Sequence, residues 1–124
     1  MARAQSKGAP GGAGRAPAAP LSVIIPTFNR PEELREALGS ILAQTVLPRE
    51  VVVVDDSTDA RVSEVTSSEA AGFLGKGSAL TYARNPPERG AGTARNVGLE
   101  MSSSEFVLFM DDDMAPAPDC LRRH

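Results

Sequence analysis

Residues 51–54 are four consecutive valines, and this run constrains the fold more than any other feature of the chain. β-Branched side chains favour extended backbone. A strand with one face in solvent alternates apolar and polar residues, whereas a continuous apolar run is typical of a parallel strand covered on both faces. We therefore expect residues 51–54 to form an inner strand of a mostly parallel sheet.

Other short apolar runs and helical repeats alternate along the chain around this strand. Further strands are expected at residues 21–26, 78–83 and 106–110. One helix is predicted after Pro31, which suits a first turn, because apolar residues then recur at helical spacing: Leu34, Ala37, Leu38, Ile41 and Leu42. Weaker helices are expected within 60–74 and over 92–101, and Asp119 is expected to open a last one. This alternation predicts an α/β protein with flanking helices.

The first 20 residues differ in composition from the rest. Fourteen of them are Ala, Gly or Pro, and such a segment buries too little apolar surface to offset the entropy of ordering it. We expect a disordered tail over residues 1–20 and a single folded unit over 21–124. The whole chain, with 41% hydrophobic and 23% charged residues, is otherwise ordinary for a globular domain.

Charge and cysteine content exclude several classes of protein. A formal net charge of −3 argues against a nucleic-acid binder that relies on a broad basic surface. The single Cys120 excludes an intrachain disulfide framework and a multi-cysteine zinc site, and it fits a reducing compartment. No apolar run approaches the length that crosses a bilayer, so no transmembrane segment is predicted. We expect a cytoplasmic protein, with peripheral membrane attachment of a full-length form left open.

Polar residues gather where three of the expected strands end. These clusters are Thr27-Phe28-Asn29, Asp55-Asp56-Ser57 and Asp111-Asp112-Asp113. In parallel α/β sheets, ligands bind outside the carboxyl ends of the strands. The sequence therefore predicts a polar ligand site along one edge of the sheet.

The aspartate triplet is the most informative of the three clusters. Three adjacent carboxylates repel each other unless a positive charge lies among them. Mg²⁺ and Mn²⁺ prefer oxygen ligands, so a divalent-cation site is expected here, and a solvated acidic turn is the alternative. The Asp55-Asp56 pair is less specific, because it is expected either to accept hydrogen bonds from a base or ribose or only to cap a turn.

Residues 89–96 allow more than one interpretation. Gly90 and Gly92 ahead of a helix partly match a dinucleotide-binding motif, but Arg95 replaces the third glycine and Asn85-Pro86-Pro87 separates the motif from its strand. Arg95 is expected either to neutralise a phosphate from the first helical turn or to lie solvated on a surface loop. A dinucleotide-binding redox domain thus remains one alternative. A receiver-like phospho-acceptor domain, suggested by Asp55-Asp56, remains another.

Taken in order, four segments resemble glycosyltransferase family 2. They are residues 23–30, 53–59, 92–99 and 109–113, with the sequences VIIPTFNR, VVDDSTD, GTARNVGL and FMDDD. The resemblance spans residues 21 to about 121 and implies the GT-A fold, which is Rossmann-like, and an inverting, metal-dependent transfer of sugar from a nucleotide-diphosphate donor. The Gly that often follows the paired aspartates in that family is absent here.

The resemblance also implies roles for individual residues. Pro26 and Thr27 would line the base pocket, Asp56 would accept from a base such as uracil, and Arg95 would contact the nucleotide. Asp111 would lie toward the ribose and Asp113 would hold Mn²⁺ or Mg²⁺ on the diphosphate, with Asp111 and Asp112 assisting in cation and nucleotide binding. The donor would be a UDP-sugar and the acceptor a glycan, a lipid or another hydroxyl compound.

The general base of that family is a carboxylate well beyond the aspartate cluster. Inverting transfer needs such a base to deprotonate the acceptor, and no residue here matches its position. We therefore expect no catalytic residue before residue 124, a sheet truncated after its fourth strand, and a chain that binds donor but is inactive or incomplete alone.

Overall fold

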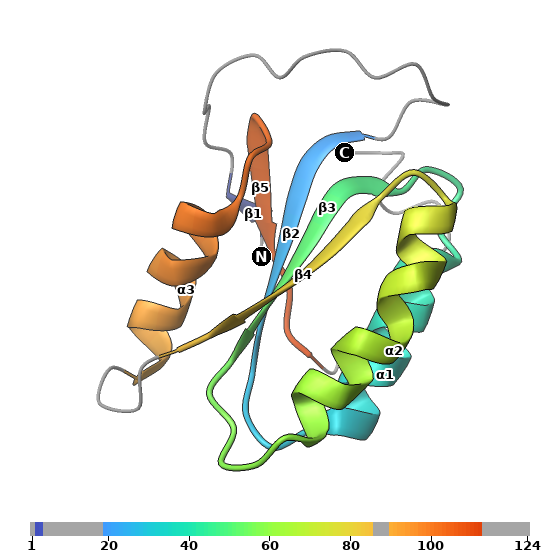
Figure 1. The fold of residues 1–124 in the computed structure, drawn as a ribbon. Coiled ribbons are helices and arrows are strands. Elements are labelled where there is room, and N and C mark those ends of the chain that lie inside the picture. The colour runs from blue at the N-terminus through green and yellow to red at the C-terminus, as the bar shows by residue number, and fades with distance from the viewer. Residues whose placement is uncertain (1, 4–18, 86–89, 113–124) are drawn as a thin grey trace.

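The computed structural model describes residues 2–3, 19–85 and 90–112, which form three helices and five strands (Figure 1). In chain order the elements are β1 (Ala2–Arg3), β2 (Ala19–Thr27), α1 (Pro31–Leu42), β3 (Pro48–Asp55), α2 (Arg61–Gly75), β4 (Ala79–Arg84), α3 (Gly90–Met101) and β5 (Phe106–Phe109). No helix in this part of the chain is long and apolar enough to cross a membrane.

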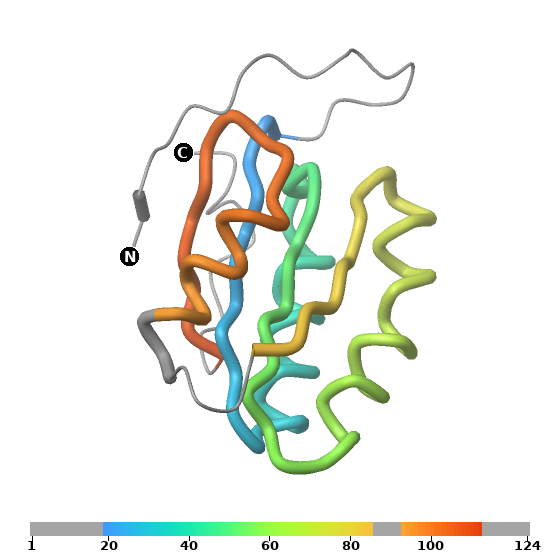
Figure 2. The backbone as a smooth tube through the Cα atoms, turned by 60° about the vertical axis from the view of Figure 1, so that its left-hand side comes forward, coloured from blue at the N-terminus to red at the C-terminus, as the bar shows by residue number. Residues whose placement is uncertain are grey.

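The strands form one sheet in the order β1-β5-β2-β3-β4. The four strands from β5 to β4 are parallel, and the two-residue β1 pairs antiparallel with β5. The chain moves outward from β2 through β3 to β4 and then returns across the sheet to place β5 on the other side of β2 (Figure 2). The direction of winding therefore reverses between β2 and β5, which in such sheets is where a crevice opens at the carboxyl edge.

Both faces of the sheet are covered, as the valine run predicts. Val51 and Val53 pack with α1 and α2, whereas Val52 and Val54 pack with α3 and β5. Figure 1 shows α1 and α2 together on one side of the sheet and α3 on the other. All four valines are fully buried, which explains why no polar residue interrupts the run.

Helix α1 follows its predicted apolar stripe. Leu34, Ala37, Leu38 and Ile41 are buried, and Pro31 occupies the first turn, where its missing N–H leaves no hydrogen bond unmade. Helix α3 lies so close to β2 that a Cβ atom at Gly98 would be 2.3 Å from Cγ2 of Ile24. Glycine at position 98 is therefore what allows α3 to pack against the centre of the sheet.

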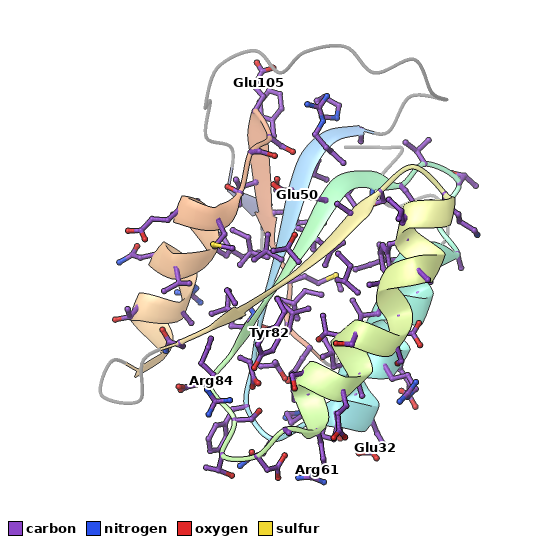
Figure 3. All side chains as sticks on the ribbon, viewed as in Figure 1. Glu32, Glu50, Arg61, Tyr82, Arg84 and Glu105 are labelled. Atoms are coloured by element: carbon purple, nitrogen blue, oxygen red, sulfur yellow. The ribbon has the colours of Figure 1, made fainter. Side chains whose placement is uncertain are left out.

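A buried carboxylate ties elements together at the amino edge of the sheet. Oε2 of Glu50 accepts hydrogen bonds from Oγ of Ser22 at 2.8 Å and from the backbone N–H and Oγ of Ser103. Figure 3 shows Glu50 far along the sheet from Tyr82 and Arg84, which lie toward the carboxyl edge. The Glu50 cluster is therefore separate from the predicted ligand site.

Strands β2 and β3 extend beyond the predicted ranges, β4 is shifted by one residue and β5 ends one residue earlier than predicted. Strand β2 includes Ala19 and Pro20, two residues assigned to the tail, because the Ala19 N–H donates to the carbonyl of Leu47 at 2.8 Å. Ala2–Arg3 form β1, which the sequence did not predict. The other tail residues and the helix predicted at Asp119 lie outside the described residues.

Candidate functional site

A pocket of about 320 Å³ lies at the carboxyl edge of the sheet, where the chain leaves β2, β3 and β5 and α3 begins. The described residues that line it are Pro26, Thr27, Phe28, Arg30, Asp56, Ala94 and Asp112. They come from four separate segments of the sequence. Their convergence follows from the parallel sheet, which brings the ends of all its strands to one edge.

Asp112 forms the acidic inner part of the pocket. Its residue surface is only 8% exposed, its Oδ2 accepts a hydrogen bond from Oγ1 of Thr27 at 2.9 Å, and its Oδ1 lies 3.5 Å from Nε of Arg30. A buried carboxylate is stable only when it is paired or hydrogen-bonded. Thr27, the last residue of β2, and Arg30, which follows the strand, thus hold this carboxylate in place.

The rest of the pocket lining combines an apolar surface with one carboxylate. Pro26, Phe28 and Ala94 contribute the apolar surface, and the Phe28 ring is 55% exposed. Asp56 stands beside them, and its backbone N–H donates to the carbonyl of Thr27 at 2.9 Å. Nδ2 of Asn85 lies 3.4 Å from Oδ1 of Asp56. A flat apolar ring with a polar N–H edge matches this combination of surfaces.

Asp55, next to Asp56, supports the site from inside the protein. It is fully buried, and its carboxylate accepts from the Tyr82 hydroxyl, from Nη1 of Arg84 at 3.3 Å and from the Ser57 N–H at 2.8 Å. Burial of the phenol and its hydrogen bond to Asp55 raise the pKa of Tyr82. A second guanidinium nitrogen of Arg84 donates to the Ser57 carbonyl. The loop after β3 is thus fixed to strand β4.

Asn29 joins the loops after β2 and β3. Its backbone N–H donates to Oγ of Ser57 at 2.7 Å, and its Oδ1 accepts from the N–H and Oγ1 of Thr58 at 3.0 and 3.2 Å. Asn29 has a φ of 54°, a left-handed conformation that asparagine tolerates better than most residues. The turn directs the chain from β2 into α1 and leaves Phe28 and Arg30 at the pocket.

The predicted site residues divide into three groups. Pro26, Thr27, Asp56 and Asp112 lie together in the pocket. Asp111 is exposed at the end of β5 and does not line the pocket, and Asp113 lies outside the described residues. Arg95 is not among the lining residues, and its guanidinium lies 5.9 Å from the centre of the Phe109 ring, within the range of a cation–π contact.

Sequence reasoning missed several residues of the site. Arg30 and Phe28 lie in motifs that were recognised, but neither was assigned a role. One signal for Arg30 was available in the sequence, since it directly precedes Pro31, at a position that favours Ser, Thr, Asp or Asn as the N-cap. In the structure Arg30 is the N-cap of α1 and makes no side-chain cap hydrogen bond. The supporting residues Tyr82 and Arg84 carried no comparable signal, because only the register of β4 against β3 brings them to Asp55.

The carboxylates of this edge suit a hard divalent cation. Mg²⁺ binds through oxygen atoms and commonly uses one or two carboxylates together with substrate phosphates. Asp112 supplies one carboxylate to the pocket lining, and Asp111, next to it in sequence, supplies an exposed one outside that lining. Within the described ranges no group of three or more potential ligands occurs. The donor set fits a cation that the protein shares with a bound phosphate group.

Two alternative interpretations of the sequence do not match the site. Helix α3 begins at Gly90 and β4 ends at Arg84, so no tight strand-to-helix turn carries the two glycines. A receiver-like site would need a lysine beside its acidic residues. Lys76, the lysine in the described part of the chain, instead donates to the Leu42 carbonyl and follows the end of α2.

The fold and the pocket together define an α/β protein whose ligand site lies at the carboxyl edge of a parallel sheet. Residues 22–124 match the model of the family described as glycosyl transferase family 2, and the chain belongs to this family. The expected GT-A type of fold is thereby confirmed for the part of that fold with which the chain aligns.

Known relatives include proteins with identified ligands. The chain is 37% identical over 94 residues to a GalNAc(5)-diNAcBac-PP-undecaprenol beta-1,3-glucosyltransferase of Campylobacter jejuni, covering 75% of this chain and 29% of that protein. Among solved structures, TarS 1-349 of S. aureus in complex with UDP matches with a TM-score of 0.70 and 32% identity, covering 83% of this chain and 30% of that one.

A mannosyltransferase, PcManGT of Pyrobaculum calidifontis, was solved in complex with GDP-Man and Mn²⁺. It matches with a TM-score of 0.68 and 33% identity, covering 85% of this chain and 32% of that one. The chain spans about three-tenths of the length of the first curated relatives that it matches.

Proposed function

We propose that this chain binds the donor of a metal-dependent, inverting glycosyltransferase, with a UDP-sugar as that donor. The observation that carries the proposal is the pocket at the carboxyl edge, which joins an apolar surface to two carboxylates in a chain of glycosyltransferase family 2. The complexes of TarS with UDP and of PcManGT with GDP-Man and Mn²⁺ support a nucleotide ligand for this chain.

In this proposal the base binds against Pro26, Phe28 and Ala94. Burial of apolar surface stabilises the base there, and Asp56 accepts a hydrogen bond from its ring N–H. The backbone hydrogen bond from Asp56 to Thr27 and the neighbouring Asn85 amide hold the carboxylate in position. Uracil, which carries one ring N–H between two carbonyl groups, is the base that we assign.

The aspartate cluster binds the diphosphate end of the donor together with Mn²⁺ or Mg²⁺. Asp111 lies toward the ribose and Asp113 holds the cation, assisted by Asp111 and Asp112. Arg95, whose guanidinium lies over the Phe109 ring, turns toward the nucleotide to contribute a further positive charge. A bound divalent cation supplies Lewis-acid stabilisation of the charge on the departing diphosphate. Asp112 is fixed by Thr27 for this role.

Transfer also requires an acceptor hydroxyl and a base to deprotonate it. The acceptor is a glycan, a lipid or another hydroxyl compound. The pocket carboxylates are committed to the base and to the cation, so we place the general base outside the described residues. In a turnover assay with UDP-sugar and Mn²⁺, we expect negligible transfer by this chain alone, and robust transfer would contradict this assignment.

Calorimetric titration of the chain with UDP tests donor binding directly. We expect UDP to bind in the presence of Mn²⁺ and not in the presence of a chelator. Asp56→Asn should weaken UDP binding about tenfold, since the hydrogen bond from the base then goes to a neutral oxygen instead of a charged one. Asp113→Ala should remove the dependence on Mn²⁺ together with most of the affinity for UDP.

Asp59→Asn is the matched control for these substitutions, because Asp59 is exposed on the loop after β3 and does not line the pocket. Metal-independent binding of UDP, or no binding by a folded sample, would show the proposal to be wrong. Tight binding of NADH, followed by nicotinamide fluorescence, would favour a redox domain instead.

A further inference from the structure

We infer that Arg30 binds the diphosphate of the donor. Before the aspartate cluster binds a divalent cation, Arg30 pairs with Asp112, and binding of the cation releases Arg30 for the diphosphate. This inference rests on the proposed function of the same pocket. It assigns a role to a residue that the resemblance left without one, and it predicts that cation and nucleotide bind in a mutually dependent manner.

The position of Arg30 is unfavourable for α1 alone. Arg30 is the N-cap of the helix, yet an arginine side chain has no acceptor for the free N–H groups of the first turn. A positive charge is also electrostatically unfavourable beside the positive end of the helix dipole. Local helix stability therefore does not account for Arg30, whereas its place in the pocket gives it a function.

Arg30 is the cation among the described residues that line the pocket, and Asp56 and Asp112 are the carboxylates. A diphosphate cannot approach two carboxylates without compensating positive charge. A guanidinium is well suited to this task, because its fork of N–H donors binds phosphate oxygens in pairs.

The contact between Arg30 and Asp112 is easily exchanged. The side chain of Arg30 is 46% exposed, and the 3.5 Å between Nε and Oδ1 of Asp112 is longer than a strong charge-assisted hydrogen bond. The Asp112 side chain is only 11% exposed, so its charge needs compensation when Arg30 leaves. Arg30 can therefore exchange Asp112 for a better anion once a bound cation compensates that carboxylate.

Asp112 is the link between the two ligands. When the aspartate cluster binds a cation, the negative charge of Asp112 is neutralised and its attraction for Arg30 weakens. The guanidinium is then available to the diphosphate, and by linkage a bound diphosphate that holds Arg30 favours binding of the cation. Thr27 keeps Asp112 in place while Arg30 moves, because it donates to the other carboxylate oxygen.

Calorimetry on Arg30→Gln separates the two halves of the inference. Without nucleotide, the variant should bind Mn²⁺ about two- to fivefold more tightly, because a competing positive charge has been removed. With saturating Mn²⁺ it should bind UDP about tenfold or more weakly, because a charge-assisted contact has been lost. Uridine, which has no phosphate, should bind the variant and the unsubstituted chain alike in an NMR titration.

Arg35→Gln is the matched control. Arg35 lies on the same helix, is 55% exposed and forms a comparable ion pair of 3.3 Å, but with Glu69 of α2 and away from the pocket. Arg35→Gln should leave the affinities for Mn²⁺, UDP and uridine unchanged. Arg30→Lys, which keeps the charge but not the fork of donors, should restore the Mn²⁺ affinity of the unsubstituted chain and only part of its UDP affinity.

Opposite changes in the Mn²⁺ and UDP affinities of Arg30→Gln support the inference. Unchanged UDP affinity, weaker binding of Mn²⁺, or an equal loss of uridine and UDP would overturn it, the last because Arg30 would then contact the nucleoside. If the unsubstituted chain binds no UDP with Mn²⁺ present, the proposed function fails. If that chain binds UDP and Arg30→Gln binds it equally well, only this inference fails.

Discussion

Substitution of Gly98 by alanine perturbs the contact between α3 and the centre of the sheet. The added Cβ would lie 2.3 Å from Cγ2 of Ile24, 3.1 Å from its Cδ1 and 3.2 Å from its Cγ1. Carbon atoms pack at about 3.5–4.0 Å, so α3 or Ile24 must shift by roughly 1 Å. Ile24 is fully buried in the sheet and cannot turn away into solvent.

Two opposing contributions set the change in the free energy of unfolding that Gly98→Ala causes. Alanine is favoured over glycine within a helix by about 1 kcal/mol, whereas overpacking of a close-packed core costs about 1–3 kcal/mol and sometimes more. We expect Gly98→Ala to lower the free energy of unfolding by about 1–2 kcal/mol. Gly39→Ala is the matched control, because Gly39 is also within a helix and a Cβ there meets no atom within 4 Å; it should raise stability by about 0.5–1 kcal/mol.

A second substitution at Ile24 reverses the sign of the effect. Ile24→Ala removes all three clashing carbons, so Gly98→Ala in that background should stabilise the protein by about 1 kcal/mol, through helix propensity. Ile24→Val keeps the methyl group at the Cγ2 position and should give no rescue. Urea unfolding followed by far-ultraviolet circular dichroism measures each free energy.

An additive cycle, in which Gly98→Ala has the same effect with and without the Ile24 side chain, would refute the packing argument. The same shift also reaches the ligand site. Ala94 lies one helical turn before Gly98 on α3 and lines the pocket. We therefore expect Gly98→Ala to weaken UDP binding as well, and Gly39→Ala to leave it unchanged.

Three further predictions concern the polar contacts. The pKa of Tyr82 is raised above its ordinary value of 10.0 by burial and by its hydrogen bond to Asp55, so near-ultraviolet absorbance of this single tyrosine should titrate above that value. The neutral phenol therefore contributes its full stabilisation below pH 10, and this contribution is lost as the pH rises through the raised pKa. A titration midpoint at the ordinary value would contradict this prediction. Glu50→Ala should lower the free energy of unfolding by about 2–4 kcal/mol, measured in urea, because it leaves the buried Ser22 hydroxyl and the Ser103 N–H without their acceptor. Glu50→Gln should lower it less, and equal losses would indicate a packing effect. Thr27→Val should weaken UDP binding in Mn²⁺ about three- to tenfold by calorimetry, since Asp112 loses a hydrogen bond; unchanged affinity would show that Thr27 does not position it.

Most of the fold could be predicted because each element carries a local pattern. The valine run predicted a strand covered on both faces, and the apolar stripe from Leu34 to Ile41 predicted the buried face of α1. Strand β1 was missed for the opposite reason. Ala2–Arg3 have no strand pattern of their own and are extended only because β5 offers an unpaired edge.

The site was less predictable, since it depends on contacts between distant segments. The sequence places three consecutive aspartates after β5, but the chain direction at the end of the strand turns Asp112 into the pocket and leaves Asp111 exposed. Arg95 was expected to face the site, and the ring of Phe109 provides a nearer surface for its guanidinium. No local pattern distinguishes these outcomes.

The position of β5 beside β2 has a consequence for the order of folding. Strands β2 to β4 and helices α1 and α2 join neighbours in sequence, but the contact between Thr27 and Asp112 spans 85 positions. Contacts of such long range are expected to form late, because closing a long loop costs entropy before the contact offsets it. During synthesis the β2–β4 unit can assemble while the pocket still lacks its acidic part. Acquisition of the proposed donor binding is therefore expected to report the docking of β5 against β2 rather than the formation of the β2–β4 unit.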